Sequence, residues 1–473
     1  MISNFPKEPF MPKQFIKLVI ACSFMILAAC GTDEGFVPEE LTDRPQVAEL
    51  QFVNLIAESP ELLITLGDLT ATVEYGTGSA QSELLIDDYE LNVSYLDADG
   101  DQIFIIENEP VKLLDQDQLV YILSGSLAAP VVEVRKFLEP QYDNNPIETG
   151  NVEVWFTSGV TDPAAFDVYL TGPTAALATA TPITNLVSGG VSEIFSQTNL
   201  SSYRLRVTPQ NSTEILFDSG EFFLFNQSRT LFAFNEYFGP VVPGNSASTI
   251  NAIRVDQFGS FNFSNSTLPS QLRAINLTSD VPSLDLYFGS TTNAPFAADL
   301  NRLEIGSYQN LQNGTNNLNL TLPGVKNQFL LEQDLFISSG TFYSLVVSGS
   351  LADDTLSSVL FVNDARQIAQ RVTVNFINTG LVNNSTNVYF LNPGQVIANS
   401  VPQITGAQTN TFSTFTARPA TVDLIVTSVI NGAVLYGPER ITLSGGITYS
   451  FILVEDMVNE ATTAELVILE DAN

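Results

Sequence analysis

Three aspartates at alternate positions form the one group of residues in the sequence that resembles a metal site. Asp97, Asp99 and Asp101 lie in the segment DADGD, where alternate carboxylates could give a hard cation such as Ca²⁺ three oxygen ligands. An EF-hand loop would continue with glycine and glutamate where this chain has Gln102 and Asn108. A tight Asp-Gly hairpin turn explains the same residues. We favour the turn, keep a structural calcium site as the alternative, and expect no other cofactor.

Groups suited to catalysis are scarce. The 473 residues include no histidine, which excludes His-based triads and removes the commonest general base at neutral pH. Neither the G-x-S-x-G elbow nor the Walker loop G-x-x-x-x-G-K-[ST] occurs. Carboxylates are so abundant that a pair of them carries little information about a hydrolase. We therefore expect no enzymatic activity and assign no catalytic residue, with a hydrolase as the weakest alternative.

Aromatic residues at defined strand positions are more informative about packing. Trp155 is the single tryptophan, and an exposed indole could stack on a sugar. Because it lies in an alternating strand, we favour a buried position between sheets. Tyr121, Tyr343 and Tyr449 occupy equivalent places and are predicted to pack or to form tyrosine corners, in which the hydroxyl bonds to the backbone.

The composition limits the partners. Asp and Glu number 52 against 18 Lys and Arg, which gives a formal net charge of -34. Such a charge disfavours nucleic acid and anionic membrane surfaces as electrostatic partners. The acidic residues are densest in the first of four repeats, where calcium or another ligand could use them. We favour a solvated acidic surface.

The N-terminus is predicted to be a signal peptide, residues 1–29. Lys7, Lys13 and Lys17 precede an apolar stretch over 18–29, which is shorter than the roughly 20 residues of a membrane span.

The end of this leader resembles a bacterial lipobox. Leu27, Ala28 and Ala29 precede Cys30, and the resemblance implies cleavage that leaves Cys30 with a diacylglycerol thioether and commonly a further acyl chain such as palmitate. Several acyl chains anchor a protein stably to a membrane. The next residue is Gly31, and the absence of Asp there resembles the outer-membrane sorting class of lipoproteins in bacteria with two membranes. We therefore expect an outer-membrane lipid anchor facing the periplasm or the cell surface.

An acidic tether is expected over residues 30–46, because this segment is short of apolar residues. Removal of Cys22 with the leader would leave one cysteine, so no disulfide is expected after processing.

Four copies of one β unit follow the tether. Each copy has an early strand that carries a short tetrapeptide: LLIT from Leu62, DVYL from Asp167, DLYF from Asp285 and NVYF from Asn387. Each also has a late strand around an aromatic residue: Tyr121, Phe232, Tyr343 and Tyr449.

The strands show period-2 alternation, and turn residues interrupt them every eight to twelve positions. This pattern is typical of half-buried antiparallel strands in a sandwich. It predicts an all-β chain of four tandem immunoglobulin-like antiparallel β-sandwich domains. We place these domains at residues 47–142, 151–266, 270–369 and 371–473.

The second copy also resembles a known family. Its segment SGVTDPAAFDVYLTG from Ser158 is similar to the S-P-D-A-P…D-V-Y-V-D-G stretch of the bacterial domain of unknown function 4397. The pair Tyr75-Gly76 in the first copy resembles another element of that family, and the resemblance covers most of residues 48–473. The third and fourth copies keep the tetrapeptide and lose the S-P-D-A-P part. The resemblance implies secreted or lipid-anchored proteins built from immunoglobulin-like repeats, and it implies no reaction.

These features together predict a non-enzymatic protein of the cell envelope. We expect a structural, adhesion or scaffold role, with the sandwiches arranged as a rod that projects from the membrane to which the acyl chains bind. The alternative is a module in the first copy that binds a glycan or a calcium-bridged partner.

Overall fold

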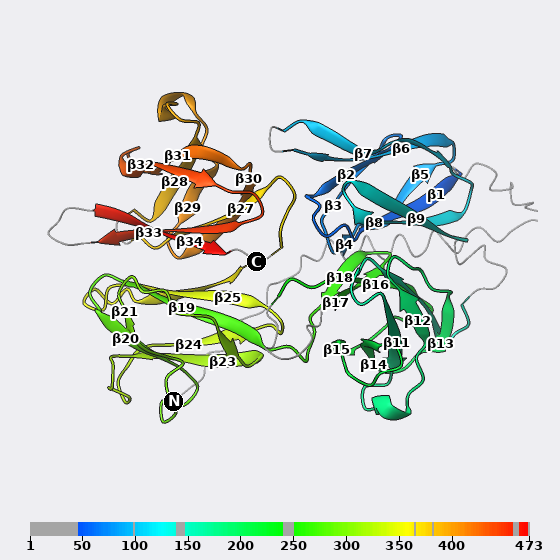
Figure 1. The fold of residues 1–473 in the computed structure, drawn as a ribbon, viewed down its shortest axis with the longest axis horizontal. Helices are drawn as coiled ribbons and strands as arrows, with labels where there is room; N and C mark the ends of the chain where they lie inside the picture. The colour runs from blue at the N-terminus through cyan, green and yellow to red at the C-terminus, as the bar shows by residue number, and fades with distance from the viewer. Residues whose placement is uncertain are drawn as a thin grey trace, which may run out of the picture. The chain divides into compact units, whose positions relative to one another are not determined.

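The computed structural model describes residues 46–97, 100–138, 147–239, 250–363, 366–380, 383–456 and 463–471. Almost every regular element in this part is a β-strand, and the exceptions are two single-turn 3₁₀ helices, η1 and η2 (Figure 1). No helix among the described residues is long and apolar enough to cross a bilayer.

The first two sandwiches contain strands β1 to β18. The first sandwich consists of β1 (Val47–Asn54), β2 (Leu62–Leu66), β3 (Leu69–Val73), β4 (Thr77–Gly78), β5 (Ser82–Leu85), β6 (Asp88–Leu96), β7 (Gln102–Lys112), β8 (Asp117–Ser126) and β9 (Ala129–Leu138). The second consists of β10 (Asn151–Ser158), β11 (Ala165–Thr171), η1 (Leu177–Thr179), β12 (Thr184–Val187), β13 (Phe195–Thr198), β14 (Tyr203–Pro209), β15 (Phe217–Phe222), β16 (Arg229–Glu236), β17 (Ile250–Asp256) and β18 (Gly259–Phe263).

The other two sandwiches repeat this element order. The third consists of β19 (Ser270–Thr278), β20 (Ser283–Phe288), β21 (Ala297–Asn301), β22 (Gln309–Leu311), β23 (Gly314–Thr321), β24 (Phe329–Ile337), β25 (Phe342–Gly349) and β26 (Ser357–Asn363). The fourth consists of β27 (Val372–Asn378), β28 (Ser385–Leu391), η2 (Ile397–Asn399), β29 (Ile404–Gln408), β30 (Thr411–Ala417), β31 (Ala420–Ser428), β32 (Val434–Leu443), β33 (Thr448–Asp456) and β34 (Thr463–Asp471).

Each sandwich has two sheets with a common strand order, to which the first sandwich adds a second short strand beside β1 and the second sandwich adds the edge strand β18. In the third sandwich, one sheet has the order β22-β19-β25-β26 and the other β21-β20-β23-β24. The predicted all-β fold of tandem β-sandwiches is therefore confirmed. Two details are additional findings. The strand order differs from the ABED/CFG order of an immunoglobulin constant domain. One central pair in each sandwich, such as β19 with β25, is parallel.

The period-2 alternation selects the residues of each sandwich's own core. In β8, Leu119, Tyr121 and Leu123 point into the core of the first sandwich. In β10, Val154 and Phe156 do the same in the second sandwich. Each sandwich therefore has its own apolar core, as the strand pattern predicts.

In the sheets that contain the parallel pair, several strands are buried on both faces. Between the residues that enter its own core, β8 places Val120 and Ile122 against the second sandwich, where they meet Leu231 of β16. The complete cluster between these two sandwiches contains Val53, Leu55, Val120, Ile122, Phe137, Trp155, Leu231, Ala233, Ile253 and Val255. Fully burying one such side chain contributes about 1.5–3 kcal/mol. This cluster, called the first joint below, therefore holds the two sandwiches together.

The third and fourth sandwiches meet through their equivalent sheets, which are the ones that contain the parallel pair. The second joint contains Ile275, Leu277, Val346, Phe361, Ile377, Ile452, Val454 and Leu469. Phe361 and Phe412 face each other across it, with ring centroids 6.2 Å apart. The expectation of a rod of sandwiches joined end to end is therefore wrong for these two pairs, because in each pair the sandwiches pack sheet against sheet.

The predicted tyrosine corners are present at two of the three positions. The hydroxyl of Tyr343 accepts the backbone N–H of Ser338 at 3.1 Å, and that of Tyr449 accepts the N–H of Ser444 at the same distance. Tyr121 instead stacks on Phe52. Burial, with a smaller contribution from the Asp117 carboxylate, raises the pKa of Tyr121 to about 12.

The tetrapeptides begin with a residue that ties strands together. The carboxylate of Asp285 accepts the backbone N–H groups of Asp299 and Gly324, at 2.9 and 3.0 Å. In the first copy the strand register places Leu63, opposite Ser94, at the equivalent position. The tetrapeptide of the first copy therefore begins at Leu63, one residue later than the sequence comparison placed it. A leucine stands there where the third copy has the carboxylate of Asp285.

Candidate functional site

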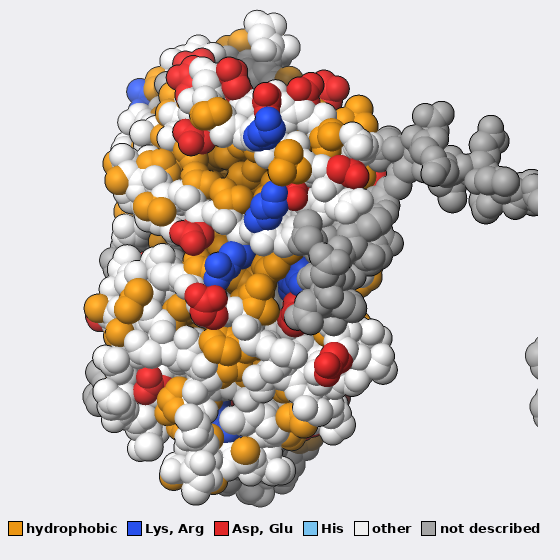
Figure 2. All heavy atoms as spheres, turned by 90° about the vertical axis from the view of Figure 1, so that its right-hand side faces the viewer, with side chains coloured by type: hydrophobic (Ala, Val, Ile, Leu, Met, Phe, Trp, Pro, Cys, Tyr) orange, Lys and Arg blue, Asp and Glu red, His pale blue; other side chains and the backbone are white. Residues whose placement is uncertain are grey.

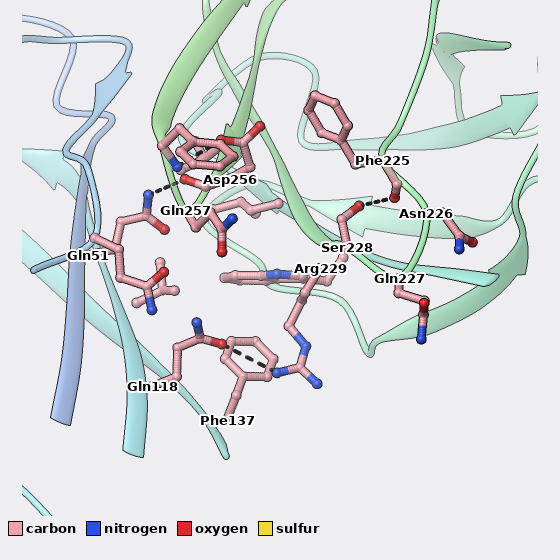
Figure 3. Close-up of a pocket in the computed structure, with 16 residues that line it drawn as sticks. Gln51, Gln118, Phe137, Phe225, Asn226, Gln227, Ser228, Arg229, Asp256 and Gln257 are labelled. Atoms are coloured by element: carbon pink, nitrogen blue, oxygen red, sulfur yellow. Dashed lines mark hydrogen bonds between the residues drawn. The ribbon is translucent and has the colours of Figure 1, made fainter. Parts of the chain in front are cut away.

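A cleft of about 210 Å³ opens beside the first joint, between the first two sandwiches. Strands β1 and β8 and the end of β9 line one side, and β10, β16 and the turn after β17 line the other. Figure 3 shows 16 residues that form its walls. The complete lining is Gln51, Gln81, Gln118, Val120, Phe137, Trp155, Phe225, Asn226, Gln227, Ser228, Arg229, Leu231, Val255, Asp256, Gln257 and Phe258.

The aromatic wall of the cleft is fixed by packing and by a cation. Trp155 is 1% exposed, and its ring centroid lies 5.6 Å from that of Phe137. The guanidinium of Arg229 lies over the Phe137 ring at 4.4 Å and also pairs with the Glu153 carboxylate at 2.8 Å. Such a cation over a ring is attracted by the ring quadrupole. These contacts within the protein hold the wall in place.

The polar wall is formed by amides. Gln51 donates from Nε2 to the carbonyl oxygens of Ser79 and Asp256, at 2.8 and 2.6 Å, so it links the two sandwiches. Figure 3 shows the amides of Gln51, Gln118 and Gln257 directed toward one space. The Gln118 oxygen accepts a long hydrogen bond of 3.5 Å from Arg229. Amides both donate and accept, so this wall suits a neutral polar ligand.

The cleft is lined by few charged groups. Its charged lining residues are Arg229, which is paired with Glu153, and Asp256, which lies 3.5 Å from Arg254. The described residues contain no cluster of three or more Asp, Glu, His or Cys side chains that could hold a metal ion. Nothing in the lining combines a nucleophile with a free general base.

A second polar junction contains the pair Tyr75-Gly76. The Tyr75 hydroxyl donates to the carbonyl of Glu236 at 3.0 Å, and the Arg366 guanidinium lies over its ring at 5.1 Å. Burial, followed by the nearby Glu236 carboxylate, raises the pKa of Tyr75 well above its ordinary value. Gly76 has φ +67°, and a side chain there would collide with Asn235. This pair therefore joins sandwiches and is not positioned to react.

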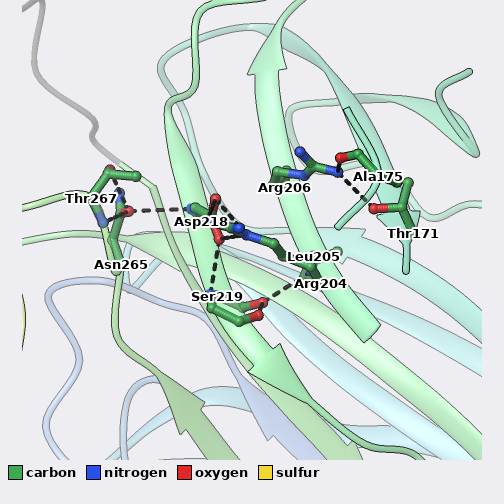
Figure 4. Close-up of polar contacts among 10 residues, drawn as sticks. Thr171, Ala175, Arg204, Leu205, Arg206, Asp218, Ser219, Asn265 and Thr267 are labelled. Atoms are coloured by element: carbon green, nitrogen blue, oxygen red, sulfur yellow. Dashed lines mark hydrogen bonds and ion pairs between the residues drawn. The ribbon is translucent and has the colours of Figure 1, made fainter. Parts of the chain in front are cut away.

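A buried ion pair fixes the segment that leads into the third sandwich (Figure 4). Asp218 is fully buried and accepts from Arg204 Nε at 2.7 Å. Its backbone N–H donates to the side-chain oxygen of Asn265, and its carbonyl accepts the N–H of Ser266. Neighbouring Arg206 donates to the carbonyl of Ala175 instead. The Asp218 cluster is therefore a structural anchor.

Two of the candidate calcium residues, Asp97 and Asp101, lie between β6 and β7 in the described part of the chain. The Asp97 carboxylate accepts the backbone N–H of Asp101 at 2.9 Å, and Asp97 also donates its own N–H to the Asp101 carbonyl. The flanking strands β6 and β7 pair antiparallel, as a hairpin requires. Asp99 lies outside the described residues, so calcium binding stays a prediction.

The predicted lipidation site also lies outside the described residues. This applies to Cys30 and to the lipobox residues Leu27, Ala28 and Ala29. Their roles stay predictions from the sequence.

Trp155 is buried, as predicted, but at a different place. It packs in the first joint instead of between the two sheets of its own sandwich. The amides and the aromatic rim of the cleft were not predicted from the sequence. A signal for the joint was present: the run from Leu119 to Leu123 is apolar at consecutive positions, as in strands buried on both faces.

The acidic side chains are dispersed. On the face shown in Figure 2 they lie singly or in small groups among apolar and uncharged side chains, with a few Lys and Arg between them. This distribution agrees with a solvated acidic surface.

Comparison with known proteins gives one family match. Residues 270–389 match the model of a domain of unknown function, DUF4397. This range covers the third sandwich and the first strands of the fourth, whereas the resemblance in the sequence is carried mainly by the second copy. The resemblance to this family is confirmed, and the match covers well under half of the chain. No curated protein matches the sequence.

Two solved structures are similar at low identity. The TIE protein of Bacillus anthracis is 10% identical with a TM-score of 0.14, over 64% of this chain and 50% of that one. This chain therefore spans about half the length of that protein. A putative cell adhesion protein from Bacteroides ovatus is 11% identical with a TM-score of 0.15, over 69% of this chain and 99% of that one. With TM-scores this low, neither structure supports an argument about this chain.

Proposed function

We propose that this chain is a lipid-anchored protein of the cell envelope with a structural, adhesion or scaffold role and without enzymatic activity. The structural role is supported by the two apolar joints. They combine the four sandwiches into two double units, and within each unit they restrict movement of one sandwich against the other. A rigid array presented by a tether suits contact with other envelope components. The lining of the described cleft, which lacks a nucleophile beside a base, supports the non-catalytic part.

The proposed anchor is Cys30, acylated after cleavage behind Ala29, and the absence of Asp at position 31 supports an outer-membrane location. Cells that express the full chain should incorporate labelled palmitate into it. Cys30→Ser should abolish the label, and Cys22→Ser, in the leader, should retain it. Label that persists in the Cys30→Ser variant would refute lipid anchoring at this residue.

The adhesion role requires a separate test. Cells that display the full chain should attach to surfaces or to each other more than cells that display residues 1–46 joined to an unrelated folded domain. Equal attachment of the two kinds of cells would refute the adhesion role. Equal sensitivity of their envelopes to detergent would refute the structural role.

A second candidate function is a ligand-binding module. The cleft beside the first joint favours it, because a concave site with aromatic walls and a few convergent polar groups is typical of small-ligand sites. A calcium-dependent version of this function rests on the Asp97–Asp101 sequence alone.

A further inference from the structure

The cleft beside the first joint combines three features that favour one ligand class. We propose that it binds one sugar unit of a neutral glycan. This proposal does not depend on the lipid anchor, because every residue that carries it lies within the described sandwiches.

The first feature is neutrality within an acidic chain. The chain has a net charge of -34, yet the cleft lining carries one basic and one acidic side chain, Arg229 and Asp256. Six lining residues carry side-chain amides instead: Gln51, Gln81, Gln118, Asn226, Gln227 and Gln257. The lining side chains have no net charge that would attract an ionic ligand. The hydroxyl groups of a neutral ligand can donate hydrogen bonds to the amide oxygens and accept them from the amide nitrogens.

The second feature is a polar group that points into the cavity. Gln51 uses its Nε2 for two backbone carbonyls, which leaves its oxygen directed toward the cavity (Figure 3). A fixed acceptor beside amides that both donate and accept suits a ligand that presents several hydroxyls, because a polar site favours the ligand that satisfies it.

The third feature is the aromatic rim. Phe258 is 69% exposed, and Phe225, also at the edge of the cleft, is half exposed. Phe223 and Phe261 add exposed rings nearby: Phe223 contacts Phe225 edge to face, and Phe261 lies under the Arg254 guanidinium. Exposed apolar patches of this kind mark interaction sites. The C–H face of a sugar ring can stack on such rings while its hydroxyls reach the amides.

The size of the cleft agrees with a single ring. Its volume of about 210 Å³ lies below the roughly 300–1,000 Å³ of pockets for drug-sized ligands. An extended peptide would need a longer groove or a free strand edge. The remaining units of a glycan would extend over the rim.

The single tryptophan makes the test specific to the site. Full-length protein in detergent is titrated with cellohexaose, maltohexaose and chitohexaose, and tryptophan emission is recorded. At least one oligosaccharide should change the emission saturably, because Trp155 lines the cleft. Gln257→Leu and Phe258→Ala should each weaken binding about tenfold, as truncation of a central contact does. Phe336→Ala, which removes a ring that is 70% exposed on β24 of the third sandwich, should leave binding unchanged.

Three results would overturn the proposal. The first is an emission that none of the three oligosaccharides changes, while circular dichroism shows folded protein. The second is an equal loss of binding in Phe336→Ala. The third is a response to a neutral Asn/Gln-rich hexapeptide and to no sugar, which would assign the cleft to peptides. None of these results bears on palmitate labelling, so the anchor and the glycan site fail separately.

Discussion

Phe137, at the end of β9, faces Trp155 of β10 across the first joint, with ring centroids 5.6 Å apart. Because β9 belongs to the first sandwich and β10 to the second, this contact links the two sandwiches directly. The Arg135 guanidinium also approaches the indole, at 5.9 Å, and donates to the carbonyl of Ser192. The pair therefore joins the apolar joint to the wall of the cleft.

Trp155→Ala should destabilise the protein markedly. Replacing a fully buried aromatic side chain by alanine costs about 3–5 kcal/mol, because transfer free energy is lost and a cavity remains. Denaturant unfolding followed by circular dichroism measures the effect, since the variant has no tryptophan to report. Trp155→Phe keeps most of the contact with Phe137 and should cost clearly less. Wild-type stability in the alanine variant would show that the first joint does not hold the sandwiches together.

The ion pairs of Arg204 and Arg440 should contribute very differently to the free energy of unfolding. Arg204→Met leaves the Asp218 carboxylate fully buried without its partner, and breaking such a pair costs about 3–5 kcal/mol. Arg440→Met is the matched control, because Arg440 is 60% exposed where it pairs with Asp423. An exposed pair contributes little to stability, because solvent screens it. Urea denaturation of both variants measures the difference, and equal losses would contradict the anchoring role of Asp218.

Asp280 should make the stability of the third sandwich depend on pH. Burial alone would raise the pKa of this carboxyl, but hydrogen bonds from the N–H groups of Ala352 and Leu351 and from the Ser350 hydroxyl outweigh burial and lower it. A lowered pKa in the folded state stabilises the protein above the unfolded-state pKa of about 3.9, and this stabilisation is lost as the pH falls through the folded-state value.

The matching experiment compares melting temperatures of the wild type and Asp280→Asn. The variant should melt lower at pH 7, and the gap should narrow below about pH 4, as the wild-type carboxyl becomes protonated. A gap that stays constant from pH 7 to pH 3 would show that the charge of Asp280 does not stabilise the loop after β25.

The pattern of alternation was sufficient for the fold because it encodes which face of a strand is apolar. Leu119, Tyr121 and Leu123 alternate with residues of the other face, and they enter the core of the first sandwich as predicted. Alternation does not say what covers the opposite face. Val120 and Ile122 are apolar too, and their partner Leu231 lies more than a hundred residues further along the chain. The joints therefore could not be derived from local periodicity.

The cleft was still harder to predict, because it depends on the joints. Gln51 appears in the sequence as an ordinary polar residue of an alternating strand. Its role arises when the carbonyl of Asp256, 205 positions away, comes within 2.6 Å of its amide. Phe258 likewise gains a neighbour only when the turn after β17 meets the first sandwich. The lipobox, in contrast, can be predicted from the sequence because it depends only on the consecutive residues 27–30.

The turn of Asp97 provides the last prediction, which decides between a hairpin and a calcium site. One oxygen of the Asp97 carboxylate already accepts the N–H of Asp101 at 2.9 Å. Asp97→Ala should therefore lower the stability by about 1 kcal/mol through the lost hydrogen bond, and Asp97→Asn, which keeps an acceptor oxygen, should retain most of it. A ligand that binds only the folded state raises the melting temperature. Millimolar calcium should leave the melting temperature of the wild type unchanged, and a rise that Asp97→Asn abolishes would establish the calcium site instead.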